Sequence, residues 1–186
     1  MFEPELTGLE RSRADRLAEL ARDVVGAAFL RGDFVLSSGA RSSYYFDKYL
    51  FETKPAILRR LGAFLAELIP PQTDRIAGPE LGAVALASAV SLETGLPFVI
   101  VKKEAKGYGT SKLVEGELYP GEKVVVVEDV VSTAAQAIRA AQQLTRAGAQ
   151  VLTILAVIDR EQGGAENISA AGYQFRPLFG KADMDL

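Results

Sequence analysis

Two adjacent carboxylates, Glu128 and Asp129, follow an uninterrupted run of valines at 124–127. Such a run is typical of a strand buried on both faces, as in a parallel sheet covered by helices. A hydroxyl-bearing pair at 132–133 comes next, and an alanine-rich helical pattern extends over 134–147. In open α/β sheets, ligands bind at the carboxyl ends of the strands, where a helix amino terminus offers unpaired N–H groups to a phosphate. The stretch therefore indicates a phosphate-binding site with two acids beside it.

The same residues also fit a purely structural role. Ser132 or Thr133 would cap the following helix, and the two acids before it would favour its first turn. Ala134 and Ala135 allow a phosphate to come close if the turn is already helical, although alanine strongly disfavours a positive φ. Taken alone, the pattern leaves a phosphate site and a capped helix open.

A second set of charged side chains follows the apolar strand expected at 98–101. Four lysines and three glycines fall within 102–116, a segment longer than the usual connection of about 4–6 residues. This composition is typical of a mobile loop, and long loops often act as lids over a ligand. A solvated, charged loop is the simpler interpretation for lysines in general.

An acid and an arginine, Asp159 and Arg160, stand after the apolar strand expected at 151–158. The end of such a strand is again a place where α/β proteins bind ligands. A surface salt bridge, usually worth about 0–1 kcal/mol, explains the pair equally well.

Alternating helical and strand patterns surround these residues. Apolar spacing predicts an amphipathic helix over 15–30, and a Ser-Gly turn between aromatic strands predicts a hairpin over 34–47. Thr53 is expected to cap a helix whose first turn holds Pro55. Further strands are predicted at 75–80, 98–101, 124–127 and 151–158, with an edge strand at 173–179. We therefore predict an α/β fold with a central parallel sheet flanked by helices.

Length and composition describe one ordinary domain. The chain has 186 residues, 48% hydrophobic and 24% charged, so we expect a single domain over 1–186. Its net charge of −3 argues against broad nucleic-acid binding, which depends on basic surface. Cysteine and histidine are absent, which excludes disulfides, thiolate or histidine metal sites and Ser-His catalytic triads. Chemistry must use Lys, Arg, Asp, Glu, Tyr, hydroxyls or a hard cation bound through oxygen.

The sequence carries no targeting or membrane signal. Residues 1–16 have mixed charges and lack the apolar core of a signal peptide. No apolar run reaches the roughly 18 residues that a membrane-spanning helix needs. A cytoplasmic protein without a membrane partner is the expectation.

Four segments resemble one known family, in the family's own order. Glu-Asp, two apolar residues and Ser-Thr at 128–133 resemble the 5-phosphoribosyl 1-pyrophosphate (PRPP) signature of the type I phosphoribosyltransferases. The serine-glycine and aromatic pattern at 34–47 resembles the amino-terminal hood of the orotate phosphoribosyltransferases, which shapes the base pocket. Lys-Lys-x-x-Lys-Gly-Tyr-Gly at 102–109 resembles their flexible catalytic loop, and Asp-Arg-x-x-Gly-Gly-x-Glu-Asn at 159–167 resembles their orotate-binding segment.

The resemblance implies a type I phosphoribosyltransferase-like fold, in which a central parallel sheet of about five strands carries a small hood subdomain and a flexible catalytic loop. The hood is expected to comprise residues 1–50 and 159–186 approximately, and the core residues 51–158. A homodimer is implied as well, with the loop lysines shared across the interface.

The resemblance also implies roles for individual residues. Glu128 and Asp129 would hydrogen-bond the ribose hydroxyls of PRPP, and Asp129 would be catalytic. The turn that cradles the 5′-phosphate would comprise Val130, Val131, Ser132, Thr133, Ala134, Ala135 and Gln136. Arg160 would bind the carboxylate of orotate, since a guanidinium makes two parallel hydrogen bonds to a planar carboxylate, and Ser132 would be a second orotate contact.

In the loop, Lys102, Lys103, Lys106 and Tyr108 would bind the pyrophosphate of PRPP, with Lys103 and Lys106 also catalytic. Tyr108 stands where the family has a histidine. Tyrosine donates a hydrogen bond to pyrophosphate, but it is no proton shuttle at neutral pH. Mg²⁺ is the implied cofactor, bound mainly through PRPP oxygens rather than through protein ligands.

The implied reaction transfers the 5-phosphoribosyl group from PRPP to orotate, giving orotidine 5′-monophosphate and pyrophosphate in de novo pyrimidine (UMP) biosynthesis. Two alternatives stay open. One is a phosphoribosyltransferase that uses a purine or another pyrimidine as acceptor. The other is a PRPP-binding regulatory protein of the same fold with little catalysis, which Tyr108 and the Ala134-Ala135-Gln136 sequence would suit.

Overall fold

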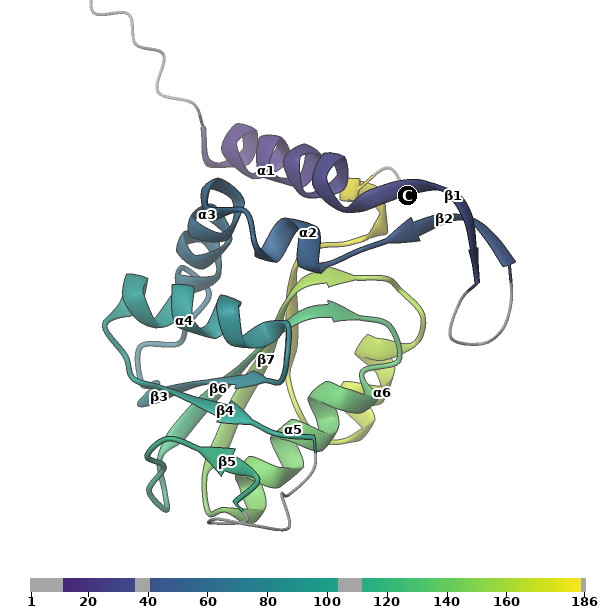
Figure 1. Cartoon of the computed structure of the whole chain (residues 1–186). Helices are drawn as coiled ribbons and strands as arrows, with labels where there is room; N and C mark the ends of the chain where they lie inside the picture. The colour runs from purple at the N-terminus through teal and green to yellow at the C-terminus, as the bar shows by residue number, and fades with distance from the viewer. Residues whose placement is uncertain (1–11, 36–40, 104–111, 185–186) are drawn as a thin grey trace, which may run out of the picture.

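The computed structural model describes residues 12–35, 41–103 and 112–184, and a six-stranded sheet lies at its centre (Figure 1). The strand order is β5-β4-β3-β6-β7-β8, and every pair is parallel except β4 with β5. The bounds are β3 (Arg75–Pro79), β4 (Phe98–Val101), β5 (Val114–Glu115), β6 (Lys123–Val131), β7 (Gln150–Asp159) and β8 (Phe175–Phe179). The predicted α/β fold with a mostly parallel sheet is confirmed, and β8 is its edge strand.

The valines at 124–127 explain why β6 lies inside the sheet. All four are fully buried. Val125 and Val127 belong to the hydrophobic core on one face, and Val124 and Val126 belong to the core on the other. Because side chains of a strand alternate between faces, an unbroken apolar run is stable only where both faces are covered. The predicted strand buried on both faces is therefore confirmed.

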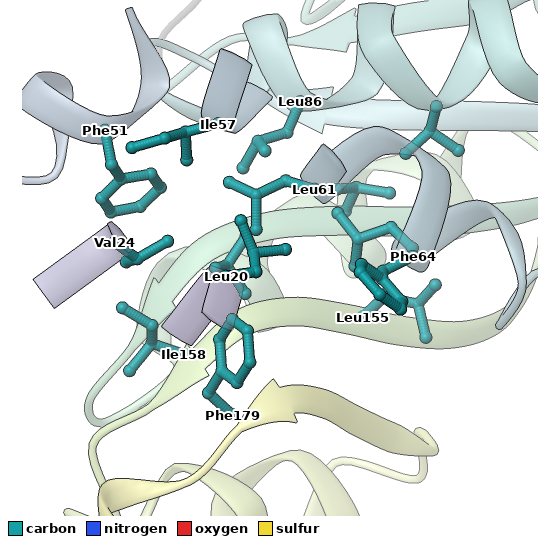
Figure 2. Packing of buried hydrophobic residues seen from close by; sticks show 14 of the residues in the cluster. Leu20, Val24, Phe51, Ile57, Leu61, Phe64, Leu86, Leu155, Ile158 and Phe179 are labelled. Atoms are coloured by element: carbon teal, nitrogen blue, oxygen red, sulfur yellow. The ribbon is translucent and has the colours of Figure 1, made fainter. Parts of the chain in front are cut away.

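Four helices cover the first face of the sheet, namely α1 (Arg13–Ala28), α2 (Tyr49–Glu52), α3 (Pro55–Ala66) and α4 (Ala83–Thr94). Their apolar side chains pack together with those of the sheet (Figure 2), and the cluster includes Leu20, Val24, Phe51, Ile57, Leu61, Phe64, Leu86, Leu155, Ile158 and Phe179. Full burial of a side chain of this size stabilises the fold by about 1.5–3 kcal/mol. Phe51 thereby anchors the short helix α2, which contributes to the site below.

Two helices, α5 (Ala135–Arg146) and α6 (Gly164–Ala170), cover the opposite face. The buried side of α5 is formed largely by Ala137, Ala140 and Ala141. Small side chains let this helix lie close to the sheet, so its amino terminus stays beside the end of β6. None of the helices in the described residues combines the length and the apolar character that a membrane crossing requires.

A separate two-stranded sheet, β1 (Phe29–Val35) with β2 (Arg41–Phe46), confirms the predicted hairpin. The strands are antiparallel, and the rings of Phe29 and Tyr44 stack with centroids 5.3 Å apart. A 3-10 turn, η1 (Lys181–Met184), contacts α1 from the other end of the chain. The division into hood and core stays a prediction, and β8, which that division assigns to the hood, pairs with β7 in the main sheet.

The predicted helix cap at Thr53 is wrong. Lys54 precedes α3 and makes no side-chain cap, and the Thr53 hydroxyl donates instead to the Tyr49 carbonyl, 2.7 Å away. Helix α2 ends just before Thr53, so its unpaired carbonyls attract this hydroxyl. Pro55 does lie in the first turn of α3, as predicted.

Candidate active site

The paired acids Glu128 and Asp129 lie near the carboxyl end of β6 and are 3% and 1% exposed. Asp129 accepts two hydrogen bonds, from the Val130 amide to Oδ1 at 2.5 Å and from the Lys48 ammonium to Oδ2 at 2.6 Å. Lys48 directly precedes α2, so it brings a cation from the hairpin side of the molecule. These partners hold the Asp129 carboxylate in place at the strand end.

A third acid, Glu52 of α2, reaches the same point and is 2% exposed. The backbone of Gly82, which precedes α4, lies against two of the acids. A Cβ at this position would be 2.1 Å from Asp129 Oδ2 and 2.8 Å from Glu52 Oε1. Any other residue would displace the carboxyl groups, so this close approach requires glycine. The Gly82 backbone thus lies directly against the acid cluster.

Burial and mutual repulsion make these carboxyl groups hard to ionise. Burial, together with the charge of Asp129, raises the pKa of Glu52 to about 8 and raises the pKa of Glu128 well above its usual range. Burial alone would lower the pKa of Lys48, but attraction to the acids outweighs it and the pKa is raised. Glu52 Oε1 and Glu128 Oε2 are buried without a hydrogen-bond partner among the described residues. The cluster therefore holds protons as well as charge, which suits hydrogen bonding to hydroxyl groups.

The turn between β6 and α5 has no side-chain cap. Ala134 precedes the helix, and neither Ser132 nor Thr133 caps it, so the capped-helix alternative is wrong. Ala134 adopts φ 64° and ψ 8°, although alanine was expected to avoid a positive φ. An uncapped helix start leaves backbone N–H groups without a side-chain partner, and such N–H groups beside a left-handed turn residue bind anions.

Helix α6 explains how Ala134 is held in this conformation. The Asn167 side chain donates to the Thr133 carbonyl at 3.1 Å. A Cβ at Gly164 would lie 2.6 Å from the Ser132 carbonyl oxygen, so α6 packs directly on the turn. The left-handed conformation costs a non-glycine residue about 1–2 kcal/mol, which these contacts offset. Gly164 and Asn167 thus support the turn from the side of α6.

A cavity of about 310 Å³ lies over the acids and the turn. Every residue of 128–136, the segment predicted to bind ribose and phosphate, lines it. Lys48, Ala137 and Arg139 complete the lining. The cavity therefore combines two carboxyl groups, the backbone of the turn and two cationic side chains, Lys48 and Arg139.

A smaller cavity of about 90 Å³ adjoins the first, and Val130 lines both. It is lined by Tyr44, Phe46, Val130, Ile158, Asp159, Arg160, Gln162 and Lys181. The hairpin supplies its aromatic wall, and Arg160 and Lys181 supply positive charge. Ser132, predicted to contact both ligands, lines the first cavity but is absent from the described lining of the second.

The surface salt bridge considered for Asp159 and Arg160 is not among the ion pairs of the described residues. Asp159 accepts the Glu161 amide at 2.9 Å instead. The backbone amide of Arg160 donates to the Val131 carbonyl at 2.8 Å. These two hydrogen bonds fix the strand end, and Arg160 lines the cavity.

A third cavity, of about 260 Å³, lies where β4 ends and shares Gln136 and Arg139 with the first. Lys102 and Lys103, both predicted to bind pyrophosphate, line it. The Lys102 side chain is 8% exposed and its Nζ lies 2.7 Å from Glu115 Oε1. Lys103 is exposed. The two lysines thus differ, because one is held by an acid and the other projects from the surface.

Glu80 connects the start of the lysine segment with α5. Its Oε1 accepts a hydrogen bond from the Lys103 backbone amide at 2.5 Å. Its backbone carbonyl accepts one from the Gln136 side-chain amide at 3.2 Å. The Gln136 side chain thus joins the first turn of α5 to the turn that follows β3. Lys106 and Tyr108, the other predicted loop contacts, lie outside the described residues.

Sequence reasoning missed several residues that line or adjoin these cavities, namely Lys48, Glu52, Arg139, Gln162 and Lys181. Arg139 was detectable, because a residue three positions after Gln136 lies on the same helix face. Lys48 and Glu52 carry no local signal. Only the packing of α2 on the core brings them to β6.

Comparison with known proteins gives matches in both sequence and structure. The family model of the phosphoribosyl transferase domain matches residues 51–171. The orotate phosphoribosyltransferase of Methanocella arvoryzae is 46% identical over 168 residues, which cover 90% of this chain and 95% of that protein. A crystal structure of Mycobacterium tuberculosis orotate phosphoribosyltransferase has a TM-score of 0.84 at 32% identity, and one in complex with PRPP has 0.79 at 31%. Each covers 92% of this chain and 99% of the solved chain.

Proposed function

The chain belongs to the orotate phosphoribosyltransferases of the type I phosphoribosyltransferase family, and we propose that its three cavities hold the parts of the two substrates. The predicted reaction is confirmed: the 5-phosphoribosyl group passes from PRPP to orotate, giving orotidine 5′-monophosphate and pyrophosphate in pyrimidine biosynthesis. The observation that best supports the placement is that Val130 joins the first cavity to the second, while Gln136 and Arg139 join it to the third. Sugar, base and pyrophosphate meet at one carbon, so the reaction requires adjoining sites.

The first cavity is proposed to bind the ribose 5-phosphate part of PRPP. Glu128 and Asp129 would face the two ribose hydroxyls, because the protonated form of Glu128, which burial favours, donates a hydrogen bond and the Asp129 carboxylate accepts one. The 5′-phosphate would lie over the amides of 132–135, where the uncapped helix and left-handed Ala134 favour an anion. Arg139, one turn further along α5, adds a positive charge on the same side.

The second cavity is proposed to bind orotate. Its aromatic wall of Tyr44 and Phe46 suits one flat heterocycle. Arg160 would form two parallel hydrogen bonds to the carboxylate, with Lys181 as a second cation. Because Val130 borders both cavities, the ring would enter beside the ribose.

The third cavity is proposed to receive the leaving pyrophosphate. Its departure places positive charge on the ribose, which the Asp129 carboxylate would stabilise, and negative charge on the pyrophosphate. Lys103 and Arg139 would stabilise the negative charge, and Lys102 would join them on leaving Glu115. The chain has no histidine. The ring nitrogen of orotate would be acidic enough to attack without a strong protein base, as in the family that the chain belongs to. Lys106 and Tyr108 stay predicted pyrophosphate contacts.

Mg²⁺ is proposed as the cofactor, carried by pyrophosphate oxygens. Among the described residues, no group of three or more acidic side chains could hold a metal ion. Lys48 already pairs with Asp129, and burial favours the protonated form of Glu128, so both acids suit sugar hydroxyls better than a cation. A bound Mg²⁺ supplies positive charge that neutralises the leaving group.

A homodimer is proposed, in which loop lysines of one subunit reach the pyrophosphate of the other. Tyr45, Tyr49 and Leu81 are 43%, 44% and 69% exposed, and an interface would bury these apolar side chains. Analytical ultracentrifugation tests this proposal, because a single species of 19.9 kDa would contradict it.

A cytoplasmic location is proposed too, because both substrates are anions that an apolar membrane interior excludes.

The proposed orotate site is tested by Arg160→Ala in steady-state assays with PRPP and Mg²⁺. Losing a charge-assisted pair worth about 1.5–3 kcal/mol should raise the KM for orotate about tenfold to a hundredfold. The KM for PRPP should stay within about twofold, since Arg160 does not line the PRPP cavity. Arg146→Ala, in the exposed last turn of α5, is the matched control. Equal orotate KM values in the two variants would place the carboxylate elsewhere.

A further inference from the structure

The proposed reaction gives Glu52 no role, yet this acid lies against the ribose site. It ends α2, is 2% exposed, and its Oε1 is buried without a hydrogen-bond partner among the described residues. Phe51 beside it is fully buried in the core, so the position of Glu52 is fixed by packing. A buried carboxyl group in such a place destabilises the protein unless it interacts with a neighbour.

That neighbour is Asp129. A Cβ placed on Gly82 would be 2.8 and 2.9 Å from the two Glu52 carboxyl oxygens and 2.1 Å from Asp129 Oδ2, so the two acids meet beside one backbone position. Hydrogen bonding between them is one of the causes that raise the pKa of Glu52.

The charges around Glu52 come from the two segments packed against it. Lys48 and Asp47 precede α2, and Asp129 comes from β6 with Glu128 beside it. The Lys48 ammonium lies 2.6 Å from Asp129, and no ion pair of the described residues joins it to Glu52. Two neighbouring buried carboxyl groups do not both ionise readily. Because Lys48 pairs with Asp129 and not with Glu52, and burial raises the pKa of Glu52, the proton is held by Glu52.

We propose that Glu52 is a positioning residue for the ribose site: its protonated carboxyl group donates a hydrogen bond to Asp129 and holds the Asp129 carboxylate toward the sugar hydroxyls. This inference rests on the proposed function, because it requires Asp129 to bind the ribose of PRPP. Glu52 would keep the Asp129 carboxylate oriented. Because it is protonated, it would also limit the negative charge of the acid cluster. Glu52 itself does not touch the substrate.

The proposal makes PRPP binding depend on pH through Glu52. Burial and the Asp129 charge raise its pKa to about 8, so above that pH Glu52 loses its proton and repels Asp129. If only the protonated form positions Asp129, the affinity for PRPP falls about tenfold between pH 7 and pH 9. PRPP itself also titrates, with a phosphate pKa near 6. Its effect on affinity is the same for all variants, so the difference between variants at each pH cancels it.

The test is a calorimetric titration with PRPP at pH 7 and pH 9 for the wild type, Glu52→Gln and Glu52→Leu. Glutamine keeps a neutral donor beside Asp129 at both pH values, so its affinity should change less than about twofold over this range. Leucine has a similar size but no donor, so it should bind PRPP about tenfold more weakly than the glutamine variant at pH 7. Rescue by glutamine but not by leucine distinguishes hydrogen bonding from space filling.

Thermal unfolding provides a reading that is independent of PRPP. The pKa of Glu52 is raised in the folded protein, so its contribution to stability is complete below its unfolded value of 4.5 and is lost as pH rises through about 8. The unfolding midpoint of the wild type should therefore fall relative to that of Glu52→Gln between pH 6 and pH 9. Parallel midpoints would show that Glu52 holds no proton and would overturn the proposal.

Failure of this proposal differs from failure of the proposed PRPP site. If Glu52→Gln shows the same loss of PRPP affinity at pH 9 as the wild type, while Asp129→Asn binds weakly at both pH values, only the role of Glu52 is overturned. If Asp129→Asn binds PRPP as tightly as the wild type, the ribose assignment fails and the role of Glu52 fails with it.

Discussion

At the amino ends of the strands, Arg75 and Glu122 form two hydrogen bonds of 2.9 and 2.6 Å, while at the carboxyl ends Glu52 and Glu128 each keep a buried oxygen without a partner in the described residues. The third such atom in the described part of the chain belongs to Gln143, which lines the cavity at the end of β4. Both ends belong to the same sheet, yet polar groups are satisfied at one and left over at the other.

The contrast extends to the backbone. At the amino ends, Asp74 accepts the Lys123 amide at 2.8 Å and joins β3 to β6. At the carboxyl ends, Ala134 is held at a positive φ and Gly82 lies against two acids. Natural proteins retain such unfavourable features where a ligand uses them. We infer that the amino ends mainly stabilise the fold and the carboxyl ends mainly bind substrate.

The largest difference between the two ends is expected from a matched pair of Asp→Asn changes. Asp129→Asn removes a charged acceptor proposed for ribose, and the affinity for PRPP should fall about a hundredfold, or 2.7 kcal/mol. Asp74→Asn, at the other end, should leave PRPP affinity within about twofold. Calorimetric titration of both variants checks this. Equal losses of affinity would remove the proposed separation of roles.

A smaller effect, on stability rather than binding, is expected from Glu122→Gln. Arg75 is only 6% exposed, so water cannot replace the charged partner that it would lose. The free energy of unfolding should therefore fall by about 2 kcal/mol at pH 7. Hydrogen bonding from Arg75 lowers the pKa of Glu122, so the wild-type contribution is present above the unfolded value of 4.5 and disappears as pH falls through the folded value.

Urea unfolding at pH 7 and at acidic pH measures this effect. The wild type and Glu122→Gln should converge as Glu122 becomes protonated. Glu93→Gln, which changes an exposed acid on α4, is the control and should stay within about 0.5 kcal/mol of the wild type. A stability gap between wild type and Glu122→Gln that persists unchanged at acidic pH would show that the ion pair is not its source.

The smallest effect is expected from glycine substitutions at neighbouring alanines. Ala134→Gly relieves a left-handed conformation and should raise the free energy of unfolding by about 0.5–1 kcal/mol. Ala135→Gly, at the first residue of α5, should lower it by about 0.5–1 kcal/mol. Chemical denaturation of both variants gives the comparison. Destabilisation by both would mean that the carboxyl-end turn stores no strain.

Features encoded by neighbouring residues were predictable from the sequence. The valines of β6 alternate between the faces of the sheet, so a local pattern was enough to identify a strand covered on both sides. The acids 128–129 and the turn after them followed from their position at the end of that strand. The whole of 128–136 lines one cavity for the same reason.

Features produced by contacts between distant segments were not predictable. Ala134 has a positive φ because Asn167 and Gly164 of α6 brace the turn before it, and nothing in the local sequence signals this. Lys48 reaches Asp129 across 81 positions in the sequence. Thr53 was misassigned because its hydroxyl had a nearer acceptor in the preceding helix.

The most direct test of the central claim is a crystal structure of this chain with PRPP bound. The ribose hydroxyls should lie within hydrogen-bonding distance of Glu128 and Asp129. The 5′-phosphate should accept hydrogen bonds from the backbone N–H groups of 132–135. PRPP bound with its ribose away from these acids, or its 5′-phosphate away from this turn, would contradict the assignment of the carboxyl ends to substrate binding.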